Sequence, residues 1–108
     1  MRLHTVPTAF PDVFLAAASS STSILASWEQ VPNIHQNGVI IGYDITFRDY
    51  NSDPTYTRAY PINNGSIFQY EEGDLGDNRY YEIYLCAFTK IGKGPQTKII
   101  AKTQETGV

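Results

Sequence analysis

Turn-forming residues interrupt this chain at short, fairly regular intervals. Clusters rich in Pro, Gly, Asn and Asp fall at 7–11, 32–38, 51–54, 63–65, 73–78 and 92–95. The segments between them are short and rich in β-branched and aromatic residues, a pattern typical of all-β sandwiches and barrels. No segment carries the sustained three-four apolar period of an amphipathic helix, so we expect almost no helix.

Strict alternation of apolar and polar residues predicts which side of each strand faces the core. The clearest strands are predicted at 23–28, 42–48 and 81–87, and weaker ones at 14–18, 56–60, 66–70 and 97–102. The residues predicted to face inward are Ile24, Ala26, Trp28, Tyr43, Ile45, Phe47, Tyr81, Ile83, Leu85 and Ala87. A slip of one residue would bury Asp44 and Arg48, so the registers are strongly specified. The predicted fold is all-β, a seven-stranded antiparallel sandwich whose odd strand number leaves the termini at opposite ends.

Length and charge narrow the class of protein. At 108 residues the chain fits one domain with a real hydrophobic core. With 42% apolar and 18% charged residues it has the composition of a folded domain. The net charge of −3 argues against a nucleic-acid partner, because nothing would neutralise a run of phosphates. No apolar stretch approaches the roughly 18 residues of a membrane helix, so we expect no direct membrane insertion by this domain.

Residue types that carry enzyme chemistry are scarce. Cys86 is the only cysteine, which excludes an internal disulfide and zinc sites built on paired thiolates. The histidines, His4 and His35, have no patterned Ser, Cys or Asp partner. The tripeptide 92–94, Gly-Lys-Gly, lacks the length and following helix of a phosphate-binding loop. We therefore expect neither catalysis nor a cofactor or metal.

Four blocks of sequence resemble a fibronectin type III domain of the kind found in animal cell-surface receptors and adhesion proteins. They are Pro11 with the following strand, the segment 21–28 ending in Trp28, the segment 37–45, and the segment 75–95. The last block is the most specific, with Leu75, Tyr81, Ile83, Leu85, Ala87, Gly92, Gly94 and Pro95 at the family's spacing. The resemblance covers nearly the whole chain. It implies an immunoglobulin-like sandwich over 11–104, with linkers or tails at 1–10 and 105–108.

The family positions also have physical roles. Trp28 is the large aromatic around which two sheets can close. Tyr81 matches the tyrosine corner, whose hydroxyl bonds back to the backbone near residues 75–77. Ala16 and Ala26 are smaller than is usual at inward positions, so we expect a bulky neighbour such as Phe14 or Phe68 to fill the core beside Trp28.

Three surface features are candidates for function. Asn64 begins the sequon Asn-Gly-Ser in a predicted turn, a candidate N-glycosylation site. The acidic residues of 71–77 are expected to form a solvated turn rather than a calcium site. The lysines near the last strand form either a weak sulfated-glycan patch or, as we favour, scattered solubilising charge. The acidic residues are Glu71, Glu72, Asp74 and Asp77, and the lysines are Lys90, Lys93, Lys98 and Lys102.

The outward side of the sixth predicted strand is unusual. Tyr84, Cys86 and Phe88 alternate there, where a solvated sheet normally shows polar residues. The loop that follows contributes Lys90, Ile91 and Lys93. We predict a partner-binding surface at these positions, with an accessible thiol on Cys86. The alternative is that lysine and arginine stems cover them.

The resemblance implies a module of a larger extracellular protein. Such modules act as spacers between neighbouring domains of one chain and as protein-binding elements in adhesion molecules, matrix proteins and receptor-type tyrosine phosphatases. We expect a cell-surface or matrix location, an extracellular protein ligand and a monomeric isolated domain. Three alternatives remain: an intracellular structural repeat of a muscle-type or cytoskeletal protein, an accessory domain of a secreted glycoside hydrolase, and a class-one cytokine receptor module. The segment 88–94 lacks the Trp-Ser-x-Trp-Ser signature of the last.

Overall fold

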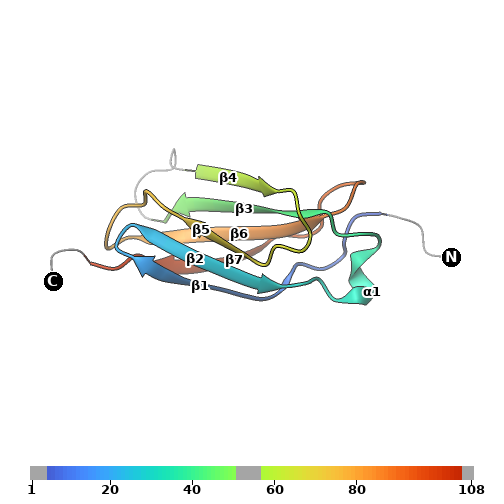
Figure 1. Ribbon diagram of the computed structural model, residues 1–108, viewed down its shortest axis with the longest axis horizontal. Coiled ribbons are helices and arrows are strands. Elements are labelled where there is room, and N and C mark those ends of the chain that lie inside the picture. Colours follow the sequence, from blue (N-terminus) through green and yellow to red (C-terminus); the bar gives the residue numbers. More distant parts are fainter. Residues whose placement is uncertain (1–4, 51–56, 106–108) are drawn as a thin grey trace.

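Seven strands form two antiparallel layers in the computed structural model, which describes residues 5–50 and 57–105 (Figure 1). The strands are β1 (Asp12–Ser20), β2 (Ser23–Glu29), β3 (Gly42–Asp49), β4 (Thr57–Ile62), β5 (Gln69–Glu72), β6 (Tyr80–Phe88) and β7 (Thr97–Lys102). One sheet has the order β1-β2-β5, and the other has the order β4-β3-β6-β7. The first and last described segments lie at opposite ends of the long axis (Figure 1). The predicted sandwich and the predicted separation of the ends are confirmed.

The short helix α1 (Asn33–Gln36) is the only helix in the described ranges. It lies in the connection from β2 to β3, where Pro32 and Asn37 bound it and Asn37 takes a left-handed backbone conformation. At four residues it is far too short to cross a membrane, and the described part of the chain offers no other helix for that purpose.

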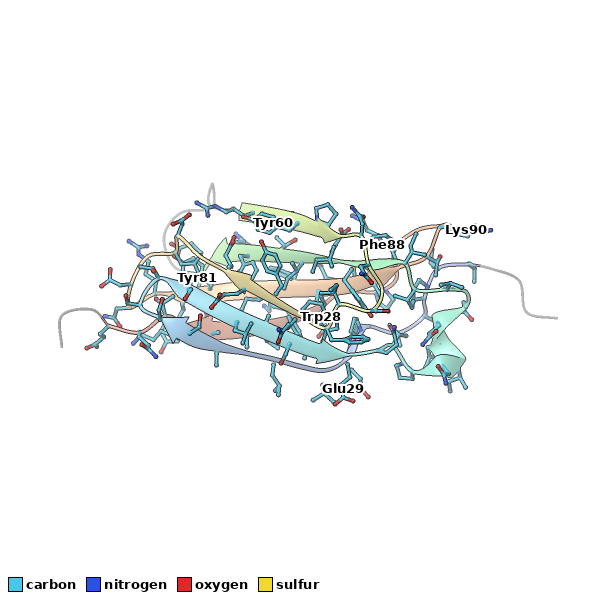
Figure 2. All side chains as sticks on the ribbon, viewed as in Figure 1. Trp28, Glu29, Tyr60, Tyr81, Phe88 and Lys90 are labelled. Atoms are coloured by element: carbon cyan, nitrogen blue, oxygen red, sulfur yellow. The ribbon has the colours of Figure 1, made fainter. Side chains whose placement is uncertain are left out.

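The core lies between the inward sides of the two sheets and is built from the residues that alternation predicts. Every predicted inward residue of β2, β3 and β6 is buried. Trp28, labelled in Figure 2, lies near the end of β2. Its ring is edge-on to that of Tyr43, with centroids 5.3 Å apart. Phe14 packs edge-on against Trp28 at 6.4 Å. Of the two bulky neighbours expected beside Trp28, Phe14 therefore fills the role, whereas Phe68 is 39% exposed and lies 6.3 Å from Tyr43.

A β-bulge in β1 sets the direction of Phe14. Asp12 pairs with Glu29 and Leu15 pairs with Ser27, so one extra residue of β1 lies between these two pairs. Val13 takes a left-handed backbone conformation with φ of 46°. Because each residue of a strand alternates in direction, the extra residue turns Phe14 inward and Leu15 outward.

Two sequence predictions about the middle of the chain need correction. The fifth strand was expected at 66–70, but β5 begins at Gln69, because the Asn64 carbonyl accepts the Ile67 N–H at 3.2 Å and keeps this segment in a turn. Three of the four acidic residues in 71–77 are exposed, as expected, but Glu72 is only 5% exposed. Glu72 points inward at the seam between β5 and β4, where burial and this neighbouring carboxylate raise the pKa of Tyr60.

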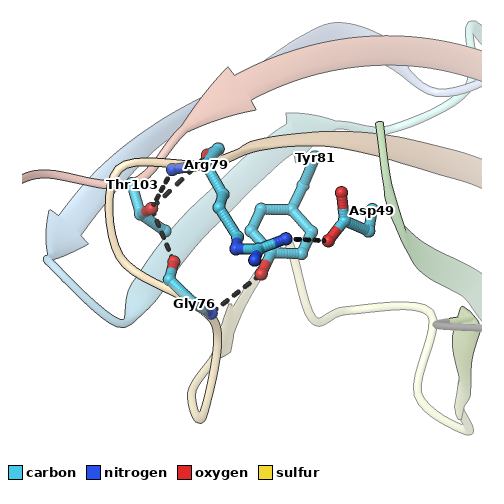
Figure 3. A network of polar contacts seen from close by, with 5 residues as sticks. All are labelled: Asp49, Gly76, Arg79, Tyr81 and Thr103. Atoms are coloured by element: carbon cyan, nitrogen blue, oxygen red, sulfur yellow. Dashed lines mark hydrogen bonds and ion pairs between the residues drawn. The ribbon is translucent and has the colours of Figure 1, made fainter. Parts of the chain in front are cut away.

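A polar network fixes the crossover from β5 to β6 (Figure 3). The Gly76 N–H donates to the Tyr81 hydroxyl oxygen at 2.8 Å, which confirms the predicted tyrosine corner. The Thr103 hydroxyl donates to the Gly76 carbonyl at 2.7 Å and accepts the Arg79 N–H at 3.0 Å. The Arg79 guanidinium pairs with Asp49 at 2.9 Å. The network joins this crossover to β3 and to the residue that follows β7.

The segment before β1 is tied to the opposite end of the sandwich. The Thr5 N–H donates to the Asn37 carbonyl at 2.8 Å, and the Thr89 hydroxyl donates to the Thr5 carbonyl at 2.8 Å. Pro7 is fully buried. A Cβ on Gly94 would lie 2.7 Å from the Pro7 carbonyl oxygen, so glycine is required for this close approach. His4 lies outside the described residues.

Candidate functional site

Ion pairs cover much of the outward side of the sheet β4-β3-β6-β7. Glu82 lies between two cations, 3.6 Å from Arg48 Nη1 and 3.2 Å from Lys98 Nζ. Lys93 Nζ reaches Asp44 at 2.6 Å, a contact that raises the pKa of this lysine. The Arg48–Glu82 pair follows from the register, because these residues oppose each other on neighbouring strands.

The loop from β6 to β7 folds back over the end of this face. The Gly94 N–H donates to the Ala87 carbonyl at 2.9 Å, and Lys93 forms a bridge with Phe88. Phe88 opposes Gly42 in the register, and the absence of a side chain there lets its ring lie against the backbone of β3. Figure 2 shows Phe88 and Lys90 at the same end of the sandwich.

A shallow groove of about 590 Å³ lies between this loop, β3 and β4. It is lined by Asp44, Thr46, Ala59, Tyr60, Pro61, Cys86, Phe88, Thr89, Lys90, Gly92, Lys93 and Gln96. One wall is the edge strand β4, whose far side pairs with no described strand. The groove combines apolar surface from Phe88 and Pro61 with an ion pair and the exposed Lys90.

Four of the predicted partner-binding residues meet in this groove: Cys86, Phe88, Lys90 and Lys93. The other two do not. Tyr84 opposes Thr46 and Lys98 farther along the sheet, and Ile91 lies exposed at the loop tip. Sequence reasoning missed the β4 wall, Ala59 and Pro61, because the pairing of β4 with β3 is a long-range contact that alternation does not reveal.

Cys86 is not accessible, contrary to prediction. Its exposure is 4%, because it opposes Asp44 in the register and the ion pair of Asp44 with Lys93 lies beside it. Burial raises the pKa of the thiol, and the Asp44 carboxylate raises it further. A thiol that is both covered and protonated is a poor nucleophile, so Cys86 contributes packing rather than chemistry.

The lysines predicted as either a glycan patch or scattered charge are mostly engaged locally. Lys93 and Lys98 form ion pairs, and Lys102 Nζ lies 5.3 Å from the centre of the Tyr80 ring. Of the acidic segment, Asp74 and Asp77 are exposed. In the described ranges no three His, Cys, Asp or Glu side chains are grouped closely enough to hold a metal ion.

Asn64 lies exposed in the turn between β4 and β5. Its side-chain oxygen accepts the Ser66 N–H at 2.9 Å, which holds the sequon in a tight, outward turn. The neighbouring Gly65 carbonyl accepts a hydrogen bond from the buried Tyr43 hydroxyl at 2.9 Å. The core therefore anchors the base of this turn, and Asn64 projects from it.

The family model of the fibronectin type III domain matches residues 11–103. Among solved structures, the third fibronectin III domain of the human KIAA0343 protein superposes with a TM-score of 0.83 at 17% identity, covering 97% of this chain and 89% of that one. At this identity the likeness shows the fold.

Two curated relatives are much longer than this chain. Human protein sidekick-1 is 39% identical over 98 residues, which cover 90% of this chain and 4% of that protein. The Drosophila melanogaster tyrosine-protein phosphatase Lar is 36% identical over 101 residues, which cover 93% of this chain and 5% of that protein. The chain thus spans only 4–5% of the length of these two relatives.

Proposed function

Since this chain belongs to the fibronectin type III family, we propose that it is a non-catalytic extracellular module of a larger cell-surface or matrix protein. In this proposal residues 11–104 are the domain, and 1–10 and 105–108 connect it to neighbouring domains of the same chain. Its roles are those of a spacer and a protein-binding element in adhesion or receptor signalling. The sidekick and phosphatase relatives support the proposal of a module in a larger protein, because the matching segment is a small part of each of these long chains.

The spacer role is supported by how the two ends of the sandwich are held. The segment before β1 is bonded to the β2–β3 and β6–β7 connections, and the residue after β7 is bonded to Gly76 and Arg79 at the far end. A pull along the chain would load these hydrogen bonds across the long axis of the sandwich. The domain therefore holds its neighbours apart at a defined separation.

The groove beside the β6–β7 loop is the observation that carries the binding role. It is concave, it mixes apolar surface with charge, and it lies beside an unpaired strand edge. These are features of surfaces that receive an extended segment or loop of another protein. The partner in this proposal is an extracellular protein.

The extracellular location is supported by two local features. Asn64 is exposed in a tight turn, where a glycan would project into solvent. Cys86 is buried, so a lone thiol would not be open to oxidation or disulfide exchange outside the cell. A lone cysteine is unusual in an oxidising environment, but a buried one is compatible with it.

Cell staining with a multivalent form of the domain tests the groove. Ala59→Arg places a bulky cation in the groove, whereas Thr57→Arg places it two residues away on the same strand and outside the groove. We expect staining by the unmodified and Thr57→Arg proteins and its loss with Ala59→Arg. Equal staining by both variants would show that the groove is not the binding surface.

The location is tested separately by the intact mass of the protein from its native source. We expect an N-glycan-removing enzyme to lower the mass, with the change localised to Asn64. An unmodified Asn64 in native material would favour the intracellular alternative.

A further inference from the structure

The outward side of the sheet β1-β2-β5 differs in kind from the groove described above. Alternation places Leu15, Ala17 and Ser19 of β1 there, beside Leu25, Ser27 and Glu29 of β2 and Gln69 and Glu71 of β5. Leu15 is 61% exposed and Leu25 is 39% exposed. These eight residues are called the leucine face below.

The two leucines are close neighbours on the leucine face. Leu15 pairs with Ser27 and Ala17 pairs with Leu25, so the leucines are diagonal partners on adjacent antiparallel strands. Diagonal partners of this kind lie roughly 7–8 Å apart by their Cα atoms. Ala17 and Ser27, which lie directly opposite the two leucines on β1 and β2, have small side chains, so no bulky group separates the leucines.

The leucine face also carries charge of one sign only. Strands β1, β2 and β5 contain four acidic residues, Asp12, Glu29, Glu71 and Glu72, and neither lysine nor arginine. Glu72 is buried, so the carboxylates that border the leucines are chiefly Glu29 and Glu71. On the other sheet, cationic stems lie across the surface, but here no strand can supply one.

We propose that the leucine face binds the surface of another protein that presents an apolar centre flanked by lysine or arginine. The leucines supply the apolar contact, and Glu29 and Glu71 select a basic rim. This binding surface is separate from the groove, so neither proposal depends on the other.

A symmetric dimer through two leucine faces is disfavoured. Two leucine faces brought together would oppose carboxylates to carboxylates with no cation between them. A preference for a basic partner therefore distinguishes the proposed contact from self-association of this face.

The test measures binding of two cyclised β-hairpin peptides to the 108-residue chain by NMR. One hairpin alternates leucine and lysine on one face, and the other has glutamate in place of each lysine. We expect the lysine hairpin to bind about tenfold more tightly, because each carboxylate contributes one exposed ion pair. The amide shifts should centre on Leu15, Ala17, Leu25 and Ser27, and added salt should reduce the difference between the hairpins.

Matched variants locate the contact. Leu25→Ser should weaken binding of the lysine hairpin roughly tenfold through loss of apolar contact. Ile100→Ser is the control, because Ile100 is 46% exposed on the outward side of the other sheet. Glu71→Gln should narrow the preference for lysine while leaving the glutamate hairpin unaffected or slightly better bound.

Several outcomes would overturn the proposal. Equal affinity for the two hairpins would show an unselective apolar surface, and shifts centred on β3 or β6 would place the contact on the other sheet. Failure of the lysine hairpin to bind at about millimolar concentration would remove the surface altogether. A concentration-dependent dimer that Leu25→Ser abolishes would assign the leucine face to a second copy.

Discussion

The two sheets share one core but meet solvent in different ways. Inward, β2 and β6 contribute the same kind of residue, large and apolar and fully covered, as with Ile24 and Leu85. Outward, β6 carries Glu82 between two cations, whereas β2 carries Leu25 with no cation on its sheet. A sandwich needs its inward residues to be apolar, but it sets no such requirement on the outward ones.

The contrast between inward and outward residues distinguishes those that stabilise the fold from those that are available to bind a partner. Inward residues are determined by the shared core, so they carry little information about function. Outward residues are where two members of one fold family can diverge. The outward side of the sheet β4-β3-β6-β7, which carries the ion pairs of Glu82 and Asp44, is called the ion-paired face below. We therefore expect it and the leucine face to respond differently to substitution and to salt.

The largest expected effects come from the core, where the two sheets should behave alike. Trp28→Ala on β2 should lower the free energy of unfolding by about 3–5 kcal/mol and Leu85→Ala on β6 by about 2–5 kcal/mol, because each leaves a cavity. Urea titration followed by far-UV circular dichroism measures both. Ser27→Ala, at the outward neighbour of Trp28, is the control and should change little. If either core variant lowered the free energy of unfolding by less than about 1 kcal/mol, its side chain would not be packed in the core as described.

The next effect concerns the crossover that joins the two sheets. Tyr81→Phe removes the acceptor of the Gly76 N–H, and it should cost about 1–3 kcal/mol because the donor is left unpaired in a partly buried place. Tyr84→Phe is matched to it, since Tyr84 lies on the same strand but faces outward. The same urea titration compares the two. Equal costs would show that the Gly76 contact contributes nothing specific.

The third effect tests how well the ion-paired face is covered. Burial raises the pKa of the Cys86 thiol, so less thiolate is present at a given pH and alkylation by iodoacetamide at pH 8 should be at least about tenfold slower than in urea. Asp44→Asn removes both the carboxylate that raises the thiol pKa and the ion pair beside the thiol, so it should speed the reaction. Rapid alkylation of the folded protein would mean that this face is open.

The same shift predicts a pH dependence of stability. The unfolded thiol ionises first because its pKa is the lower one, so the unfolded state gains stability as pH rises through the ordinary thiol range. The free energy of unfolding should therefore fall with rising pH across that range. Cys86→Ala should lack this component, and an identical pH profile for both proteins would contradict it.

The fold was predictable because alternation reports which residues are inward, and the inward residues build the sandwich. The strands containing Trp28, Tyr43 and Tyr81 were correct for this reason. The start of β5 was not predictable, because it depends on hydrogen bonds of the Asn64 turn rather than on apolar pattern. Burial of Glu72 was also missed, since it follows from the meeting of β4 and β5 across the seam.

The candidate site was predictable only in part, because a groove is a property of residues from several strands. The alternation of Tyr84, Cys86 and Phe88 indicated a surface, and Lys93 was added because it lies in the loop that follows. Ala59 and Pro61 reach the groove only through the register of β4 on β3. The burial of Cys86 likewise depends on the contact between Lys93 and Asp44, which no local pattern contains.

The smallest expected effects distinguish the two outward faces directly. Glu82→Gln removes two ion pairs and should lower the free energy of unfolding by no more than about 1 kcal/mol at low salt, with less effect at high salt. Leu25→Ser should change it by less than about 1 kcal/mol at any salt concentration, because the leucine is partly exposed and has no charge partner. Urea titrations at two ionic strengths measure both variants.

The salt dependence matters more than the size of either change. If Glu82→Gln were insensitive to salt, the ion pairs would not stabilise their face. A loss above about 1 kcal/mol for Leu25→Ser would mean that the leucine already packs within the domain. If Leu25→Ser leaves the free energy of unfolding nearly unchanged but weakens binding of a basic, partly apolar partner, Leu25 serves recognition rather than stability. Glu82→Gln should do the reverse, so the two results together would distinguish the leucine face from the ion-paired face.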